Sequence, residues 1–95
     1  HLEFGAEHGD ADSQRYLGVC YYYGRGVEQD YAKAVEWFQM AADQGYANAQ
    51  YDMGRSYELG HGVEQDMTLA VEWYTKAAEQ GNKSAQQALD RLSGT

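Results

Sequence analysis

The side chains that could support catalysis or hold a metal are few, and their spacing matches no recognisable site. The three histidines, His1, His8 and His61, lie in unrelated contexts, and none forms a close helical pair with another histidine or a cysteine. The serines occupy helix or cap positions and lack the motifs that surround a serine nucleophile. The sequence therefore predicts no metal site and no serine-based catalytic centre.

Two carboxylates recur at equivalent positions, Glu36 and Glu72, and a glycosidase would need two carboxylates across one cleft. Because these two lie one repeat apart on successive helices, a charged outer face explains them better. The loops at 24–30 and 60–66 each contain two nearby glycines, as phosphate-binding loops do, but no strand precedes them and no Lys-Ser/Thr pair follows. We therefore expect neither enzymatic activity nor a bound cofactor.

The composition disfavours several classes of partner. The 15 acidic and 7 basic side chains give a net charge of −8, and no basic patch is visible, so we expect no nucleic-acid partner. An acidic balance favours basic protein partners, although a plain solvated surface also explains it. No apolar run is long enough to cross a membrane and no stretch has signal-peptide organisation, so we expect no membrane insertion. Cys20, the only cysteine, suits the cytoplasm without excluding export, and the compartment stays undetermined.

The sequence contains an internal repeat, and the elements of this repeat must position these side chains. Residues 11–46 and 47–82 align without a gap and are identical at 18 of 36 positions. A fixed period in the thirties indicates one small supersecondary unit that stacks on copies of itself. A third, partial unit covers 83–95, and residues 1–10 are either the end of an earlier unit or, at their start, the remnant of a purification tag. We expect one structural domain.

Each unit is predicted to fold as two helices joined by the glycine loop. Apolar residues recur at i, i+3, i+4 and i+7 in four stretches, at about 13–23, 31–44, 49–59 and 67–80. N-cap residue types precede the helices: Asp12, Asn48 and Ser84 before the first helix of each unit, and Asp30 and Asp66 before the second.

A glycine recurs inside the first helix of each unit, as Gly18 and Gly54. Glycine costs up to about 1 kcal/mol relative to alanine inside a helix, so its recurrence predicts a close approach by another helix. Gly45 and Gly81 follow the second helix, where a C′ glycine commonly ends a helix.

The combined pattern resembles the Sel-one-like repeat (SLR) family, a relative of the tetratricopeptide repeats. Three motifs carry the resemblance: Ser/Ala-x-x-x-Leu/Met-Gly-x-x-Tyr, Gly-x-Gly-Val-x-x-Asp and Ala-x-x-Trp-Tyr/Phe-x-x-Ala-Ala-x-x-Gly, which together span 13–45 and 49–81. The glycine loop and the 36-residue period favour this family over ordinary 34-residue tetratricopeptide repeats. The chain departs from the secreted cysteine-rich branch of the family, whose repeats each carry a disulfide, because it has one cysteine.

The resemblance implies an all-α fold, a right-handed α-α superhelix (solenoid) of antiparallel helix pairs with a concave groove. It also implies a protein-interaction module or adaptor that binds a peptide or partner protein in that groove and is not an enzyme. The alternative is a structural segment of a longer scaffold that associates with itself end to end, because the open ends of an array expose apolar faces.

In the related architecture the first helix of each pair lines the groove. Positions that differ between the two units, on the face away from Leu17 and Tyr21, are then the expected partner contacts. Tyrosine and arginine, which dominate binding hot spots, are among them. The expected partner-binding residues are Asp12, Arg15, Val19, Tyr22, Asn48, Tyr51, Arg55, Glu58, Gln87 and Arg91.

Overall fold

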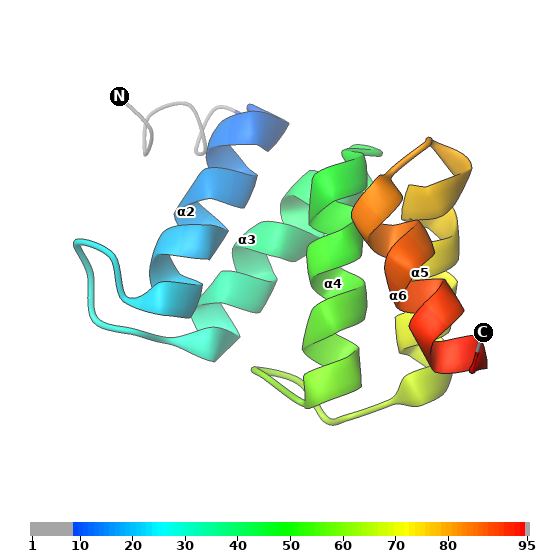
Figure 1. The fold of residues 1–95 in the computed structure, drawn as a ribbon. Coiled ribbons are helices and arrows are strands. Elements are labelled where there is room, and N and C mark those ends of the chain that lie inside the picture. The colour runs from blue at the N-terminus through cyan, green and yellow to red at the C-terminus, as the bar shows by residue number, and fades with distance from the viewer. Residues whose placement is uncertain (1–8, 95) are drawn as a thin grey trace.

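A computed structural model describes residues 9–94, and in that range the chain forms five α-helices and no strand. The helices are α2 (Ala11–Tyr23), α3 (Tyr31–Asp43), α4 (Ala47–Leu59), α5 (Met67–Glu79) and α6 (Lys83–Ser93). Helices α2 and α3 pack as one pair, α4 and α5 as the next, and α6 packs on α5 (Figure 1). The predicted all-α solenoid of antiparallel pairs is confirmed, and its extents of 41 × 24 × 17 Å are those of a short stack.

The first helix of each repeat begins two residues earlier than the sequence predicts. The N-cap positions belong to Asp10, Tyr46 and Asn82, so the prediction that Asp12, Asn48 and Ser84 cap these helices is wrong. The Asp10 side chain accepts a hydrogen bond from the backbone N–H of Asp12, and Asn82 accepts one from that of Ala85. In α2 and α6 the helix thus extends to an upstream side-chain acceptor, whereas α4 begins after Tyr46, which makes no side-chain cap hydrogen bond.

The predicted caps of the second helices are confirmed. Asp30 accepts a hydrogen bond from the Lys33 N–H, and Asp66 accepts one from the Leu69 N–H, each at 3.1 Å. The two glycine loops also close identically, since the backbone N–H of each aspartate donates to a carbonyl of the preceding helix at 2.9 Å.

The recurring glycines inside α2 and α4 are where the paired helices meet. A Cβ at Gly18 would lie 2.7 Å from the Phe38 ring, and one at Gly54 would lie 2.6 Å from the Tyr74 ring. Both rings are buried, at 0% and 1% exposure, and each is the centre of a hydrophobic cluster. The predicted close approach is confirmed, and glycine is required because no other residue leaves room for the ring.

Candidate interaction surface

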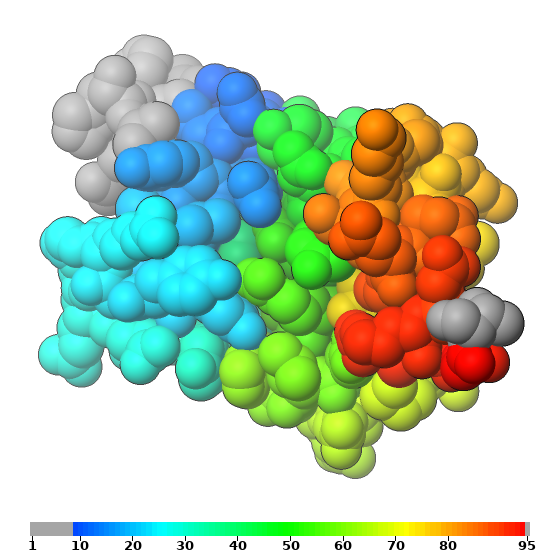
Figure 2. All heavy atoms as spheres, in the orientation of Figure 1, coloured from blue at the N-terminus to red at the C-terminus, as the bar shows by residue number. Residues whose placement is uncertain are grey.

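Helices α2, α4 and α6, the first helices of successive repeats, present one face of the molecule, and α3 and α5 lie behind them (Figures 1 and 2). We call this the front face. Glu36 and Glu72, on the rear helices, are exposed, which agrees with the charged outer face expected for them. Within the described residues, surface hollows occur beside the two glycine loops and along the outer side of α5 and α6.

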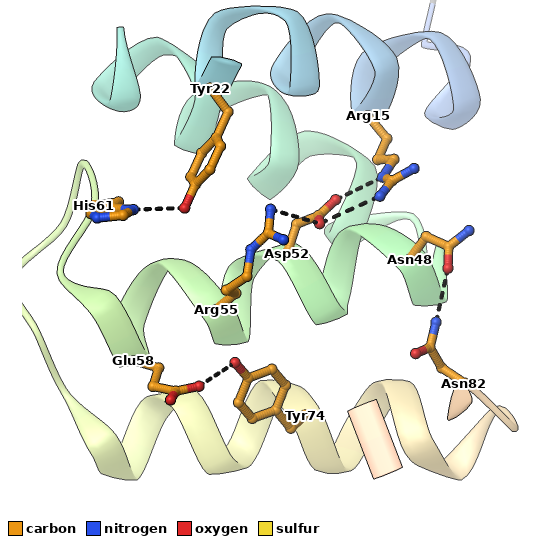
Figure 3. Close-up of polar contacts among 9 residues, drawn as sticks. All are labelled: Arg15, Tyr22, Asn48, Asp52, Arg55, Glu58, His61, Tyr74 and Asn82. Carbon is orange, nitrogen blue, oxygen red and sulfur yellow. Dashed lines mark hydrogen bonds and ion pairs between the residues drawn. The ribbon is translucent and has the colours of Figure 1, made fainter. Parts of the chain in front are cut away.

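A buried carboxylate joins α2 to α4 at the centre of this face. Asp52 is 1% exposed, and its Oδ2 accepts a hydrogen bond from Arg15 Nε at 2.7 Å. Arg55 approaches the same carboxylate, with Nη2 3.9 Å from Oδ1 (Figure 3). Burial raises the pKa of the Asp52 carboxyl, and the two guanidinium groups act in the opposite direction. One buried negative charge is thus compensated by two positive ones.

The Arg55 guanidinium lies between two aromatic rings. Its central carbon is 4.9 Å from the Tyr22 ring centroid and 5.7 Å from that of Tyr51. These distances are those of cation–π contacts, which hold the guanidinium in place. Its Nε is buried and has no hydrogen-bond partner within residues 9–94. Arg55 is therefore fixed by stacking and by charge, while its hydrogen-bonding capacity is unused.

A second ion pair joins α4 to α6. Arg91 donates to both oxygens of Glu58, at 2.7 and 2.9 Å, and the Tyr74 hydroxyl donates to Glu58 at 2.7 Å. The hydrogen bonds from Arg91 lower the pKa of the Glu58 carboxyl, and Tyr74 adds to the effect. Burial raises the pKa of the Tyr74 hydroxyl, so it stays a donor. Both carboxylate oxygens of Glu58 are thereby satisfied from within the chain.

The N-terminal ends of these helices are linked in the same way. The Tyr46 hydroxyl donates to Asp12 at 2.6 Å, and the Asn82 amide donates to Asn48 at 2.8 Å. Tyr46 and Asn82 occupy equivalent positions in successive repeats, as do Asp12 and Asn48. The residue types at these positions differ between the repeats, but a side-chain hydrogen bond joins them at both repeat boundaries.

Two pairs of the expected partner-binding residues, Tyr22 with Arg55 and Glu58 with Arg91, contact each other across the repeat boundary. Tyr22 and Glu58 are equivalent positions, and each contacts the arginine at the matching position of the next repeat, Arg55 or Arg91. Some of the sequence differences between the two repeats therefore reflect different side-chain contacts with the next repeat. A position that varies between repeats is not, for that reason alone, a recognition position.

The structure separates these residues by exposure. Tyr22 is 6% exposed and belongs to the first hydrophobic cluster, so its placement on the face away from the core is wrong. The reason is that the loop of the second repeat covers it, with the Tyr22 hydroxyl 2.6 Å from His61 Nδ1. Val19 and Tyr51 are half-buried against the two clusters. The exposed members are Asp12, Asn48, Gln87 and Arg91, and the half-buried charged members are Arg15, Arg55 and Glu58.

Two residues of this network have no sequence signal. Asp52 pairs with Arg15 37 positions away, and His61 bonds to Tyr22 39 positions away. His61 also stacks on the Tyr31 ring, with centroids 4.3 Å apart and planes 3° from parallel. A motif search finds neither residue, because their partners lie in the preceding repeat.

Within residues 9–94 no cluster of three or more histidine, cysteine or acidic side chains could hold a metal, and no helix is long and apolar enough to cross a membrane. The stacked helix pairs and the front face that joins them define an α-solenoid of the tetratricopeptide-like class.

The chain belongs to the Sel1 repeat family. The family model of the Sel1 repeat matches residues 11–46 and 47–82, which are the two 36-residue units, and Sel1 repeats mediate protein–protein interaction. A search of curated proteins finds no match.

Solved structures agree with this assignment. A Sel1 repeat protein from Oxalobacter formigenes is 46% identical with a TM-score of 0.92, and the match covers 95% of this chain and 68% of that one. The protective antigen c5321 of uropathogenic Escherichia coli, which has an SLR fold, is 43% identical with a TM-score of 0.94, over 96% of this chain and 20% of that one. Helicobacter pylori cysteine rich protein B is 25% identical with a TM-score of 0.86, over 92% of this chain and 65% of that one.

Proposed function

We propose that this chain is an interaction module that binds a peptide or a partner protein on the front face, which corresponds to the concave groove of the family. The observation that carries the proposal is Arg55, held between Tyr22 and Tyr51 with its hydrogen-bonding capacity unused. Arginine and tyrosine are the residues that most often dominate binding energy. A side chain fixed before binding also loses less conformational entropy when a partner arrives.

The proposed role is binding rather than catalysis. The two carboxylates at the centre of the front face are engaged in joining the helices, Asp52 with Arg15 and Glu58 with Arg91. A catalytic acid or base needs a proton-transfer partner in the substrate and a pKa near the working pH. The pKa of Glu58, lowered by Arg91, moves away from that range.

Site-specific photocrosslinking tests this proposal. A photoreactive phenylalanine analogue replaces either exposed Gln87 on the front face or exposed Glu36 and Glu72 on the rear helices. We expect crosslinks to a partner in lysate of the source cells from position 87 and not from the rear positions. Crosslinks only from 36 and 72 would place binding on the other side and end the proposal.

Self-association is a second candidate function, favoured by the exposed apolar side of α5. Val71 is 40% exposed, whereas its equivalent in the first repeat, Val35, is 9% exposed and lies beside Gly62 of the next loop. However, α6 occupies the place beside α5 where the first helix of another copy would stack. Sedimentation over a wide concentration range tests this candidate, and a monomer throughout would exclude it.

A further inference from the structure

The charges of this acidic chain are unevenly distributed. Its net charge is −8, yet α2, α4 and α6 together carry four acidic and four basic side chains and are neutral. Three of the four arginines, Arg15, Arg55 and Arg91, lie on these helices. The excess of negative charge is carried by the rest of the chain. A partner that contacts the front face therefore meets a surface unlike the one that the net charge suggests.

The paired carboxylates are more buried than the arginines. The accessible surface at the ion pairs is therefore more positive than the net charge of these helices suggests. The side chains of Asp52 and Glu58 are 0% and 13% exposed, whereas those of Arg15, Arg55 and Arg91 are 32%, 25% and 58% exposed. The carboxylates lie beneath the arginines and hold them from below. The exposed acidic side chains of these helices are Asp12, which accepts a hydrogen bond from Tyr46, and Asp90 on α6, which accepts one from Gln86. At the two ion pairs, a partner thus meets guanidinium groups before it meets carboxylates.

The hydrogen bonds of these arginines are not exhausted. A guanidinium has five N–H donors in a planar fork suited to carboxylates. Arg55 makes no hydrogen bond within residues 9–94, and its contacts are two rings and an ion pair at 3.9 Å. Charge-assisted hydrogen bonds to a carboxylate are about twice as strong as neutral ones. A carboxylate from outside can therefore gain bonds here without breaking any that Arg55 already makes.

We propose that the front face binds an acidic, extended segment of a partner protein, whose carboxylates engage Arg55 and Arg91 across α4 and α6. This assignment rests on the proposed function and differs from the basic partner that the net charge favours. Repulsion from the remaining acidic surface is screened beyond about 8 Å at physiological ionic strength, so contacts at the arginines decide binding.

The test uses the whole chain and three hexapeptide probes with a neutral dye: hexaglutamate, hexalysine and a Ser-Gly repeat. Fluorescence anisotropy near neutral pH measures the affinity of each. We expect hexaglutamate to bind most tightly, and Arg55→Gln and Arg91→Gln each to weaken it by at least about tenfold, the effect of one charge-assisted hydrogen bond. Lys76→Gln on α5 removes the same charge from the rear layer and should change the affinity less than about twofold.

Variants at Gln87 keep the test valid if the arginine variants unfold, because this side chain is exposed and makes no hydrogen bond or ion pair with residues 9–94. We expect Gln87→Glu to weaken hexaglutamate binding and Gln87→Lys to strengthen it, each by several-fold. Thr68→Lys adds the same charge at an exposed position of α5 and is the control for Gln87→Lys. It should change the affinity for hexaglutamate little.

Each contrary outcome overturns the inference. The inference fails if hexaglutamate does not bind at millimolar concentration, or if hexalysine or the Ser-Gly peptide binds more tightly. It also fails if the front and rear variants change the affinity equally. Photocrosslinks from position 87 would then still support partner binding on this face, whereas crosslinks only from positions 36 and 72 would mean that the proposed function has failed as well.

Discussion

At the scale of single residues, the central feature is a carboxylate that the fold buries and then neutralises. Asp52 is 1% exposed and depends on Arg15 and Arg55 for compensation. A buried pair adds little net stability, but removal of one partner is costly because the other charge stays buried. The arginines of the front face therefore support the junction between repeats, and we propose that they also present donors to a partner.

Replacement of Arg15 tests the first role. We expect Arg15→Ala to lower the free energy of unfolding by about 2 kcal/mol, because Asp52 keeps its burial and loses its hydrogen bonds. Urea denaturation measures the loss, and Arg25→Ala, in an exposed loop, is the control. Asp52→Asn in the Arg15→Ala background should recover part of the loss. Equal effects of Arg15→Ala and Arg25→Ala would show that the pair does not support the fold.

The pair of Glu58 with Arg91 makes stability depend on pH. The pKa of Glu58 is lower in the folded chain than in the unfolded one, so the pair stabilises the fold above the unfolded pKa of about 4.3 and loses this effect as the pH falls through the folded pKa. We therefore expect the wild type to exceed Glu58→Gln in urea midpoint near pH 7, and the difference to shrink progressively as the pH falls below about 4.3. A difference that stays constant over this acidic range would contradict this linkage.

At the scale of elements, the glycine loop has a second function besides reversing the chain. In the second repeat it packs on the preceding one: a Cβ at Gly62 would lie 2.7 Å from the Tyr31 carbonyl carbon and 3.0 Å from Val35. His61 of the same loop stacks on Tyr31. In the first repeat, a Cβ at the equivalent Gly26 would meet nothing within 4 Å. The same loop thus has a contact role in one repeat that it lacks in the other.

This difference gives a matched pair of variants. Gly26 and Gly62 have φ values of 75° and 80°, so alanine pays the same left-handed backbone cost, about 1–2 kcal/mol, at both positions. Gly62→Ala must also displace the Tyr31 backbone, and we expect it to cost at least about 1 kcal/mol more than Gly26→Ala. Thermal and urea unfolding compare the two. Equal losses would mean that the loop does not dock on the preceding repeat.

At the scale of the whole molecule, stability is distributed along the stack. Each helix packs mainly on its sequence neighbours, as expected for a solenoid. Helix α4 is covered by both α3 and α5, and its Met53 is 0% exposed. Helix α6 packs on α5, and the equivalent Leu89 is half-buried. Helices α4 and α6 are equivalent in successive repeats, but α4 packs against two helices and α6 packs mainly against one.

Hydrogen exchange should report this inequality. We expect the backbone amides of α6 to exchange faster than those of α4, because α6 can open without disturbing the rest of the stack. Exchange measured by NMR or mass spectrometry near neutral pH gives both rates in one sample. Equal protection of the two helices would indicate that the chain unfolds as a single cooperative unit.

The fold was largely predictable because its signals are local. Two identical Gly-x-Gly-Val-Glu-Gln-Asp loops and a 36-residue period predicted the helix pairs and their order. Gly18 and Gly54 indicated the close helix contacts that Phe38 and Tyr74 make. The candidate surface was only partly predictable. Tyr22, expected on the face away from the core, is buried in it, and Asp52 was not among the expected residues.

By itself, the sequence determined the repeat, the helices and the glycines at which they meet, since each depends on residues within one period of the chain. Only the tertiary structure decided which side chains are exposed on the front face and which face the next repeat. Neighbouring helix positions differ by about 100° in direction, so the rotation of each helix within the stack decides between Tyr21 and Tyr22. That rotation is set by packing with the adjacent repeat, as are the pairs Arg15–Asp52 and Glu58–Arg91 that span more than 30 positions.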